Sequence, residues 1–240
     1  MLDDLKNARH PAPARSGPLR RFGWLLARLV AAFLIISVAQ VVIFKFVPVP
    51  ITLTMLMDEH PVTKDWTPLA DIDRDMVAAV ISGEDGKFCL HNGFDKDAIL
   101  QAFRRNQKGG RIRGGSTISQ QTAKNVFLWQ GGGYLRKGLE AWYTVLIETI
   151  WGKRRIMEVY LNVAETGIDT YGVEAGAQRY YGKSARKLSA VEAARIAAVL
   201  PLPKQREVNG AGGFTRRHGN AIARRVGVVK NDALDACVYN

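Results

Sequence analysis

Cysteine and histidine are scarce in this sequence. Two cysteines, Cys89 and Cys237, and four histidines stand among 240 residues. So few thiols exclude a disulfide framework and a cysteine-based zinc site. No internal repeat is present, and a 47% share of apolar residues excludes wholesale disorder. The length predicts one catalytic-size domain with a sizeable core.

Acidic residues are also in deficit. Lys and Arg number 34 against 22 Asp and Glu, which leaves a formal charge of +12. Such a balance favours an anionic partner, whether nucleic acid, anionic lipid or a phosphorylated substrate. Composition alone does not choose among the three.

One long stretch near the N-terminus lacks charge. Residues 24–47 are mostly apolar, with no charged residue from Leu29 to Phe44. A bilayer core needs about 20 such residues in a helix. Residues 1–23 are basic, which marks the cytoplasmic side. A cleaved signal peptide usually has a shorter apolar stretch and a small-residue cleavage site. The sequence therefore predicts a single-pass anchor with the rest of the chain outside the cytoplasm, which favours lipid over nucleic acid as partner.

The chain beyond the anchor divides into three parts. Prolines punctuate residues 48–70, which indicates an extended linker with a short strand at 51–57. Helical periodicity dominates residues 71–205, where a basic glycine-rich loop is expected at 107–115 and helices are expected at 97–106, 116–125, 136–151, 153–162, 173–181 and 189–200. Residues 206–240 form a basic tail whose arginines favour a solvated helix face. Little strand signal remains, so the fold class is mostly α.

Two segments suit acid–base chemistry and anion binding. Residues 84–95 place carboxylates and a histidine at the end of an apolar helix, as general acid–base work requires. Residues 114–125 place glycines before a helix, a pattern that exposes backbone N–H groups to an anion. Taken alone, the first segment is also typical of a solvated helix terminus at which Asp85 or Asp95 caps a neighbour, and the second of a surface helix.

A third segment concentrates cations around a carboxylate. Arg136 and Lys137 precede Glu140 by four and three positions, so the three side chains share one helix face. This arrangement would suit a phosphate-binding site. An ordinary surface ion pair, worth about 0.3–0.5 kcal/mol, is the alternative.

Together these segments resemble the motifs of the peptidoglycan glycosyltransferase family. The family motif E-D-x-x-F-x-x-H-x-G is matched by Glu84, Asp85, Phe88, His91 and Gly93. Residues 114–125 resemble G-G-S-T-I-x-Q-Q-x-x-K-N, residues 136–140 resemble R-K-x-x-E, and residues 156–162 resemble I-x-E-x-Y-L-N. The resemblance covers about residues 51–203.

The resemblance implies a fold and an activity. The fold would be a lysozyme-like helical glycosyltransferase domain with one N-terminal transmembrane helix. The activity would be polymerisation of lipid II into β-1,4-linked glycan with release of undecaprenyl pyrophosphate. Because the chain ends at Asn240, the resemblance is to the monofunctional type without a transpeptidase domain.

The resemblance also implies residue roles. Glu84 would be the general base, and Glu140 the second catalytic glutamate, orienting cations and holding a divalent metal. That metal, Mg²⁺ or Mn²⁺, would not be obligatory. The expected substrate- and pyrophosphate-binding residues are Asp85, Phe88, His91, Ser116, Thr117, Gln120, Gln121, Lys124, Asn125, Arg136 and Lys137.

The implied surroundings follow from the same resemblance. Partners would be lipid II, the growing glycan chain, the bilayer and wall-synthesis or cell-division proteins, but not nucleic acid. The location would be the bacterial inner membrane, with the catalytic domain on the periplasmic side.

Residues 94–135, rich in aromatic and basic side chains, would dip into the headgroup layer or form a core stripe beside a basic face. A Cys89–Cys237 bridge is compatible with this location, but the spacing does not decide it.

Two other functions stay open. A lysozyme-like hydrolase or lytic transglycosylase would also use one principal glutamate on a helical fold, but it has no pyrophosphate to bind and no need for the cations. An inactive membrane-anchored scaffold for other wall enzymes is the second alternative, against which the intact Glu84 and Glu140 argue.

Overall fold

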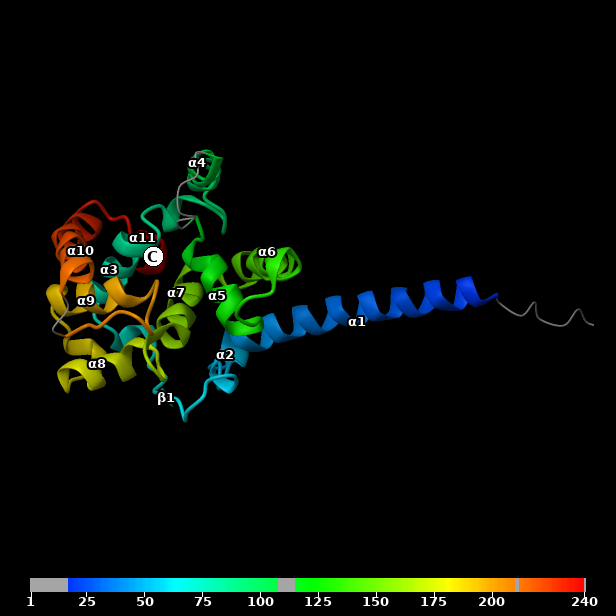
Figure 1. Cartoon of the computed structure of the whole chain (residues 1–240), viewed down its shortest axis with the longest axis horizontal. Coiled ribbons are helices and arrows are strands. Elements are labelled where there is room, and N and C mark those ends of the chain that lie inside the picture. Colours follow the sequence, from blue (N-terminus) through cyan, green and yellow to red (C-terminus); the bar gives the residue numbers. More distant parts are fainter. Residues whose placement is uncertain (1–16, 108–114, 210–211, 240) are drawn as a thin grey trace, which may run out of the picture. The chain divides into compact units, whose positions relative to one another are not determined.

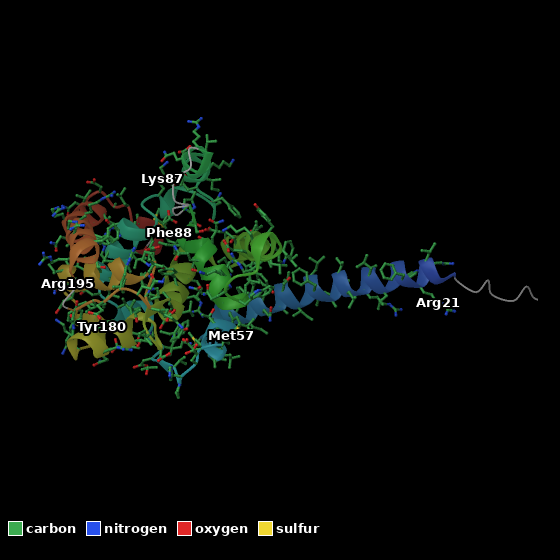
Figure 2. The ribbon with its side chains drawn as sticks, in the orientation of Figure 1. Arg21, Met57, Lys87, Phe88, Tyr180 and Arg195 are labelled. Carbon is green, nitrogen blue, oxygen red and sulfur yellow. A yellow bond between two sulfur atoms is a disulfide. The ribbon has the colours of Figure 1, made fainter. Side chains whose placement is uncertain are left out.

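The computed structural model describes residues 17–107, 115–209 and 212–239, in two compact units that divide after Gln40. Helix α1 (Pro18–Phe46) supplies the described part of the first unit. From Leu19 to Phe46 it is apolar and long enough to cross a membrane, and most of its side chains are exposed (Figures 1 and 2). An exposed apolar helix of this length fits the expected membrane anchor.

The second unit is mostly helical. Its described helices are α2 (Leu53–Leu56), α3 (Arg74–Glu84), α4 (Lys96–Gln107), α5 (Ile118–Phe127), α6 (Gly133–Ile150), α7 (Gly152–Val163), α8 (Val173–Tyr181), α9 (Ala190–Val199), α10 (Gly213–Asn231) and α11 (Ala236–Tyr239). Short 3-10 turns occur at η1 (Leu69–Asp71), η2 (Phe88–Leu90) and η3 (Ala185–Lys187). The expected mostly α class is confirmed.

One small sheet completes the fold. Strand β3 (Thr170–Tyr171) lies between β1 (Thr63–Lys64), to which it is parallel, and β2 (Glu165–Gly167), to which it is antiparallel. The strand expected at 51–57 is wrong, because that segment forms helix α2. The Thr52 hydroxyl caps this helix by accepting from the Met55 N–H. Of the expected loop at 107–115, residues 108–114 lie outside the described part of the chain.

Helix α3 runs through the core. Asp73 caps its first turn by accepting from the Asp75 N–H at 2.8 Å. Its next two turns are wholly buried, at Met76, Val77, Ala78, Ala79, Val80 and Ile81. The alanine-rich α9 and the apolar side of α10 pack against it (Figure 1). Because α3 ends at Glu84, this packing sets where that carboxyl group lies.

The segment before α3 is tied to α7. The Asn162 side chain accepts from the Thr67 N–H at 2.7 Å and donates to the Thr67 carbonyl at 2.9 Å. Glu158 accepts from the Leu69 N–H at 3.2 Å. The conspicuous polar residues of the 156–162 motif therefore satisfy backbone groups at the entrance to α3.

The last turns of α1 belong to the second unit. Trp151 Nε1 donates to the Val41 carbonyl at 2.7 Å. The Arg155 guanidinium donates to the Phe44 and Val47 carbonyls, at 2.8 and 2.7 Å. The two Arg155 bonds satisfy carbonyl groups that the C-terminus of α1 leaves unpaired. The end of the apolar helix is thus built into the helical domain.

Residues 212–239, the described part of the chain after the 210–211 gap, pack into the domain. The arginines of α10 are exposed, as expected, at Arg216, Arg217, Arg224 and Arg225. On its other face Ile222, Val226 and Val229 are buried. Cys89 and Cys237 form a disulfide, with their Cα atoms 5.5 Å apart. This bridge joins the segment after α3 to α11.

Candidate active site

The first two sequence segments meet through Asp85. This residue follows Glu84 at the end of α3, and its carboxylate accepts from the Ile118 N–H at 3.0 Å. The same carboxylate lies 3.0 Å from His91 Nε2. Asp85 and His91 thus hold the start of α5 against the end of α3.

A second link joins the same segments. The Thr117 hydroxyl donates to the Gly93 carbonyl at 2.6 Å. Gly93 has φ +86°, and a Cβ there would lie 2.6 Å from Thr144 Cγ2, so only glycine fits this turn. Thr117 and Gln120 also form a capping box at the start of α5. The glycine and threonine of the two motifs are therefore structural supports of the site.

The start of α5 offers less to an anion than its sequence indicated. The Ile118 N–H is paired with Asp85, and the Gln120 N–H with the Thr117 hydroxyl. Both amide groups are already hydrogen-bonded within the protein, so neither is available to an anion. An anion in this region must be met mainly by side chains.

Glu84 is held from one side by an amide. Gln121 Nε2 donates to Glu84 Oε2 at 2.9 Å, and Tyr160 donates its hydroxyl to Gln121 Oε1 at 3.4 Å. The tyrosine orients the amide so that its NH₂ end faces the carboxylate. Glu84 Oε1 is buried and has no hydrogen-bond partner in the described ranges. One oxygen is positioned while the other stays free to accept a proton.

Burial raises the pKa of the Glu84 carboxyl above its ordinary 4.5. Asp85 raises the pKa further, whereas the Gln121 hydrogen bond and the charges of Arg206 and Lys124 lower it. A base with a raised pKa takes up a proton more readily than an ordinary glutamate. The environment of Glu84 therefore suits proton abstraction.

Three cations gather around Glu140 on the opposite side of the pocket. Arg136 Nη1 lies 2.5 Å from Glu140 Oε2, and Lys137 pairs with Glu140 Oε1. Gly132, with φ +89°, lets the chain approach α6 closely, since a Cβ there would lie 2.9 Å from Arg136 Cβ. The buried Arg136 Nε has no hydrogen-bond partner within the ranges that the structure covers. That atom is an unused donor for a ligand.

The environment of Lys124 disfavours the charged form of its ammonium group. Burial lowers the pKa of its ammonium group, Glu140 raises it, and Arg136 and Lys137 lower it again. An incoming polyanion would offset this repulsion and favour the charged form of the ammonium group. Lys124, Arg136 and Lys137 together make a site that favours phosphate oxygens.

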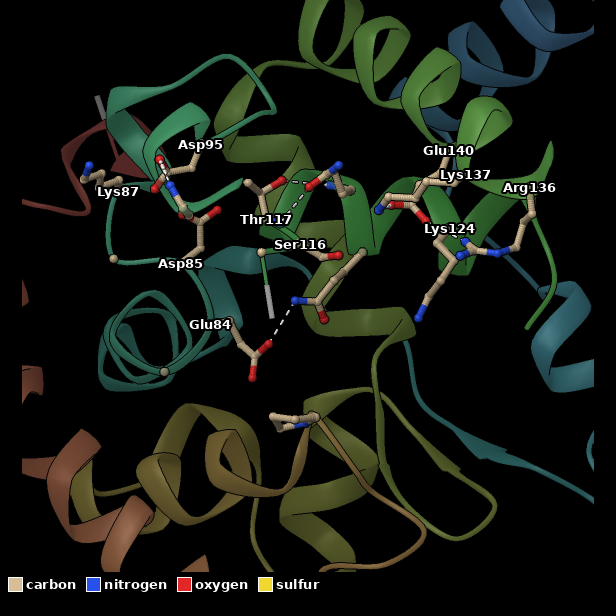
Figure 3. Close-up of a pocket in the computed structure, with 17 residues that line it drawn as sticks. Glu84, Asp85, Lys87, Asp95, Ser116, Thr117, Lys124, Arg136, Lys137 and Glu140 are labelled. Carbon is tan, nitrogen blue, oxygen red and sulfur yellow. Dashed lines mark hydrogen bonds and ion pairs between the residues drawn. The ribbon is translucent and has the colours of Figure 1, made fainter. Parts of the chain in front are cut away.

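One pocket of about 620 Å³ joins the two sides. Figure 3 shows Glu84 at one side and Lys124, Arg136, Lys137 and Glu140 together at the other. The predicted site residues that line it are Glu84, Asp85, Ser116, Thr117, Gln120, Gln121, Lys124, Arg136, Lys137 and Glu140.

Three predicted site residues lie elsewhere. Phe88 is fully buried and does not line the pocket, and the Lys153 ammonium lies 4.5 Å from its ring centre. His91 lines another pocket, which shares Lys87 and Asp95 with the first, and its Nε2 atom contacts the site residue Asp85. Asn125 lines a second pocket of about 470 Å³, which shares Gln121 and Lys124 with the first. Phe88 and His91 therefore support the site without lining it.

Sequence patterns missed Arg206 and Pro201. Arg206 follows α9 and lowers the pKa of Glu84 by its charge, and Pro201 lines the pocket. Each is separated from Glu84 by more than 100 positions in the chain. No local pattern could have indicated them, because only the packing of α9 on α3 brings them near.

The expected divalent metal at Glu140 does not fit the donor set. Both carboxylate oxygens of Glu140 are engaged by cations, and a metal there would face Lys124, Arg136 and Lys137 at close range. Within the described ranges, no group of three or more His, Cys, Asp or Glu side chains could hold a metal ion. No catalytic step is therefore derived through a metal at this residue.

The chain is similar in sequence to a known protein family and to proteins of several bacteria. The transglycosylase family model matches residues 52–230. A protein of Caulobacter vibrioides is 47% identical over 88% of this chain and 94% of its own length. One of Pasteurella multocida is 44% identical over 97% and 98%, and one of Rhodospirillum centenum is 43% identical over 90% and 95%. All three are named biosynthetic peptidoglycan transglycosylase.

Proposed function

The chain belongs to the transglycosylase family and is a peptidoglycan glycosyltransferase, and we propose that Glu84 is the general base of its reaction. The matched domain fits the monofunctional type. Two substrates meet in the reaction: an acceptor lipid II and a growing glycan chain that carries a lipid pyrophosphate. The observation that supports the proposal is the single pocket that holds Glu84 and the three cations.

In the proposed step Glu84 takes the proton from the acceptor sugar's 4-hydroxyl. That oxygen forms a bond to the anomeric carbon of the donor, and the bond from this carbon to the pyrophosphate oxygen breaks. The bonding electrons leave with undecaprenyl pyrophosphate, and Glu84 later releases the proton to water. Attack from the face opposite the leaving group inverts the anomeric centre and yields a β-1,4 linkage.

Lys124, Arg136 and Lys137 are proposed to bind the departing pyrophosphate. Its negative charge grows as the carbon–oxygen bond breaks, so these cations bind the transition state more strongly than the ground state. Glu140 holds two of them in place through its ion pairs. A general base contributes about 10²–10⁴-fold, and the cations and substrate positioning would supply the remaining acceleration.

Glycan cleavage is less well supported. Most glycoside hydrolases use two carboxyl groups, one as acid and one as base or nucleophile. Here the second glutamate of the pocket, Glu140, is paired with Arg136 and Lys137. Because both of its carboxylate oxygens are engaged by these cations, Glu140 has no free oxygen to serve as the second carboxyl group of a hydrolase.

We also propose that α1 anchors the enzyme in the bacterial inner membrane, with the catalytic domain outside the cytoplasm. The basic N-terminal residues support this orientation. The Cys89–Cys237 bridge supports it independently, because disulfides persist mainly in oxidising compartments. A tethered site meets its lipid-linked substrate at the membrane surface.

The direct test uses labelled lipid II and purified sacculi. The full chain in detergent or liposomes should convert lipid II into glycan polymer and release no soluble muropeptides from sacculi. Glu84→Gln should polymerise lipid II about 10²–10⁴-fold more slowly than the wild type. Soluble fragments from sacculi would contradict the transfer reaction, and equal polymerisation by both proteins would contradict the role of Glu84.

A further inference from the structure

The C-terminal segment lies against the helix that presents Glu84. Residues 213–239, which we name the C-terminal clamp, comprise α10, a short turn and α11. Ile222 of α10 is buried beside Gly83, where a Cβ would lie 2.9 Å from Ile222 Cδ1. The residue immediately before Glu84 thus touches the clamp with no spare room.

The clamp holds the first turn of α3 by ion pairs. The Arg74 guanidinium donates to both carboxylate oxygens of Asp235, at 2.7 and 2.8 Å. The Asp235 side chain is fully buried. Lys230 pairs with Asp75 at 2.5 Å. A bidentate pair with a buried carboxylate fixes geometry as well as charge.

The clamp holds the segment after α3 by a covalent bond. Cys89, in η2, is bridged to Cys237 of α11. The next residue, Val238, is fully buried, and its carbonyl accepts from Arg154 Nη1 at 3.1 Å. Figure 2 shows the neighbouring Phe88 within the domain. Glu84 therefore lies between two attachments to the same segment, one at Arg74 and one at Cys89.

We propose that the C-terminal clamp positions Glu84 for catalysis, with Arg74, Asp235, Cys89 and Cys237 as positioning residues that act through α3 and η2. This inference rests on the proposed role of Glu84 as base. None of the four residues lines the pocket that holds Glu84 and the cations. Their effect must therefore pass through the backbone that carries the carboxylate.

The rate of proton abstraction depends on how accurately the base is placed relative to the proton that it removes. A misplacement of about 1 Å can cost roughly 10²-fold, even when its cause is remote from the reacting atoms. The cations proposed to bind the substrate lie on α5 and α6, and among the described residues no hydrogen bond, ion pair or disulfide joins them to the clamp. Loosening the clamp should therefore lower kcat much more than it changes KM.

The pH dependence of kcat is a second readout of how the clamp holds Glu84. The groups that face Glu84 are Asp85 at the end of α3, Gln121 and Lys124 on α5, Tyr160 on α7 and Arg206 after α9. Loosening the clamp would admit water to a carboxyl whose burial raises its pKa. The acid limb of the kcat profile should then move to lower pH.

The test compares the full-length enzyme before and after reduction. A water-soluble phosphine takes up oxygen from water and delivers two electrons and two protons to the bridge, which yields two thiols. With lipid II as substrate, we expect kcat to fall about 10-fold or more and KM to change less than about twofold. The double variant Cys89→Ser/Cys237→Ser should have the low rate from the start and not respond to the phosphine.

A second pair of variants tests the other attachment. Asp235→Asn should lower kcat and shift the acid limb, and Asp235→Glu should restore part of both. The matched control is Asp71→Asn, which breaks the exposed Arg186–Asp71 pair and should change neither. Circular dichroism on each protein separates loss of rate from loss of fold.

Three outcomes would overturn the proposal: an unchanged kcat after mass spectrometry shows two free thiols, a rise in KM alone, or activity lost in step with helical signal. If Glu84→Gln is inactive while reduction has no effect, only the clamp proposal fails. If Glu84→Gln polymerises lipid II normally, the assignment of the base fails first.

Discussion

Gln121 Nε2 donates to Glu84 Oε2 at 2.9 Å, although the two residues are 37 positions apart. Glu84 ends a helix buried in the core, and Gln121 lies one turn into the next catalytic segment. Among the residues that the structure describes, the other oxygen, Glu84 Oε1, has no hydrogen-bond partner. Because the Tyr160 hydroxyl binds the other end of the amide, the donor cannot turn away without losing that contact.

Replacing the carboxylate should abolish its proton transfer. Glu84→Gln keeps the shape but removes the base, so polymerisation should fall about 10²–10⁴-fold. Binding of lipid II should remain within a few-fold of the wild type, because the cations are intact. Gel analysis of labelled glycan with a binding titration measures both, and a normal rate would refute the assignment.

Activity should depend on pH through Glu84. The ionised form is the active base and its pKa is raised, so the rate should fall with acidification earlier than for an ordinary glutamate. The Gln121 hydrogen bond lowers this pKa, so Gln121→Leu should raise it and move the acid limb up by roughly one pH unit. Tyr160→Phe should shift the limb the same way by less. A limb that moves to lower pH in Gln121→Leu would contradict this account.

Neutralising one cation should weaken pyrophosphate binding. Arg136→Gln also leaves Glu140 with one partner fewer, and kcat/KM should fall about 10–100-fold, as expected for the loss of a charge-assisted hydrogen bond. The exposed Lys187→Gln serves as a matched control with the same charge change. Steady-state kinetics on lipid II compare the two. Equal losses in both variants would indicate a general effect of net charge.

Chelation should affect the enzyme little. We propose that side chains rather than a metal at Glu140 neutralise the pyrophosphate, so EDTA should lower kcat less than about twofold at constant ionic strength. Readdition of Mg²⁺ or Mn²⁺ provides the control. A loss restored only by one of these ions would show that a metal takes part, and Glu140→Gln would then reveal whether this residue holds it.

The disulfide should stabilise the fold as well as the site. It closes a loop with a sequence separation of 148, and removal of a native bridge typically costs about 2–5 kcal/mol. Cys89→Ser/Cys237→Ser should therefore unfold at lower denaturant concentration than the oxidised wild type. The reduced wild type should match the variant. Coincident curves for the oxidised protein and the variant would show that the bridge contributes nothing to stability.

Local sequence patterns determined much of this protein. The apolar run predicts α1, helical periodicity predicts the helices of residues 71–205, and motif order predicts the family and both glutamates. These features depend on residues near one another in the chain, where side-chain period and capping act directly. The same local reasoning failed at 51–57, because Thr52 caps a helix where prolines favoured an extended chain.

Tertiary structure decided how those residues are used. Asp85, His91 and Thr117 connect segments of the site by hydrogen bonds, and the charge of Arg206, which follows α9 in the chain, acts on Glu84. The C-terminal residues, which appeared as a basic tail, became a clamp on α3 because one face of α10 is apolar. Such relations depend on which helix faces pack together and how far each side chain is withdrawn from water. They form between residues distant in sequence, so only the folded chain specifies them.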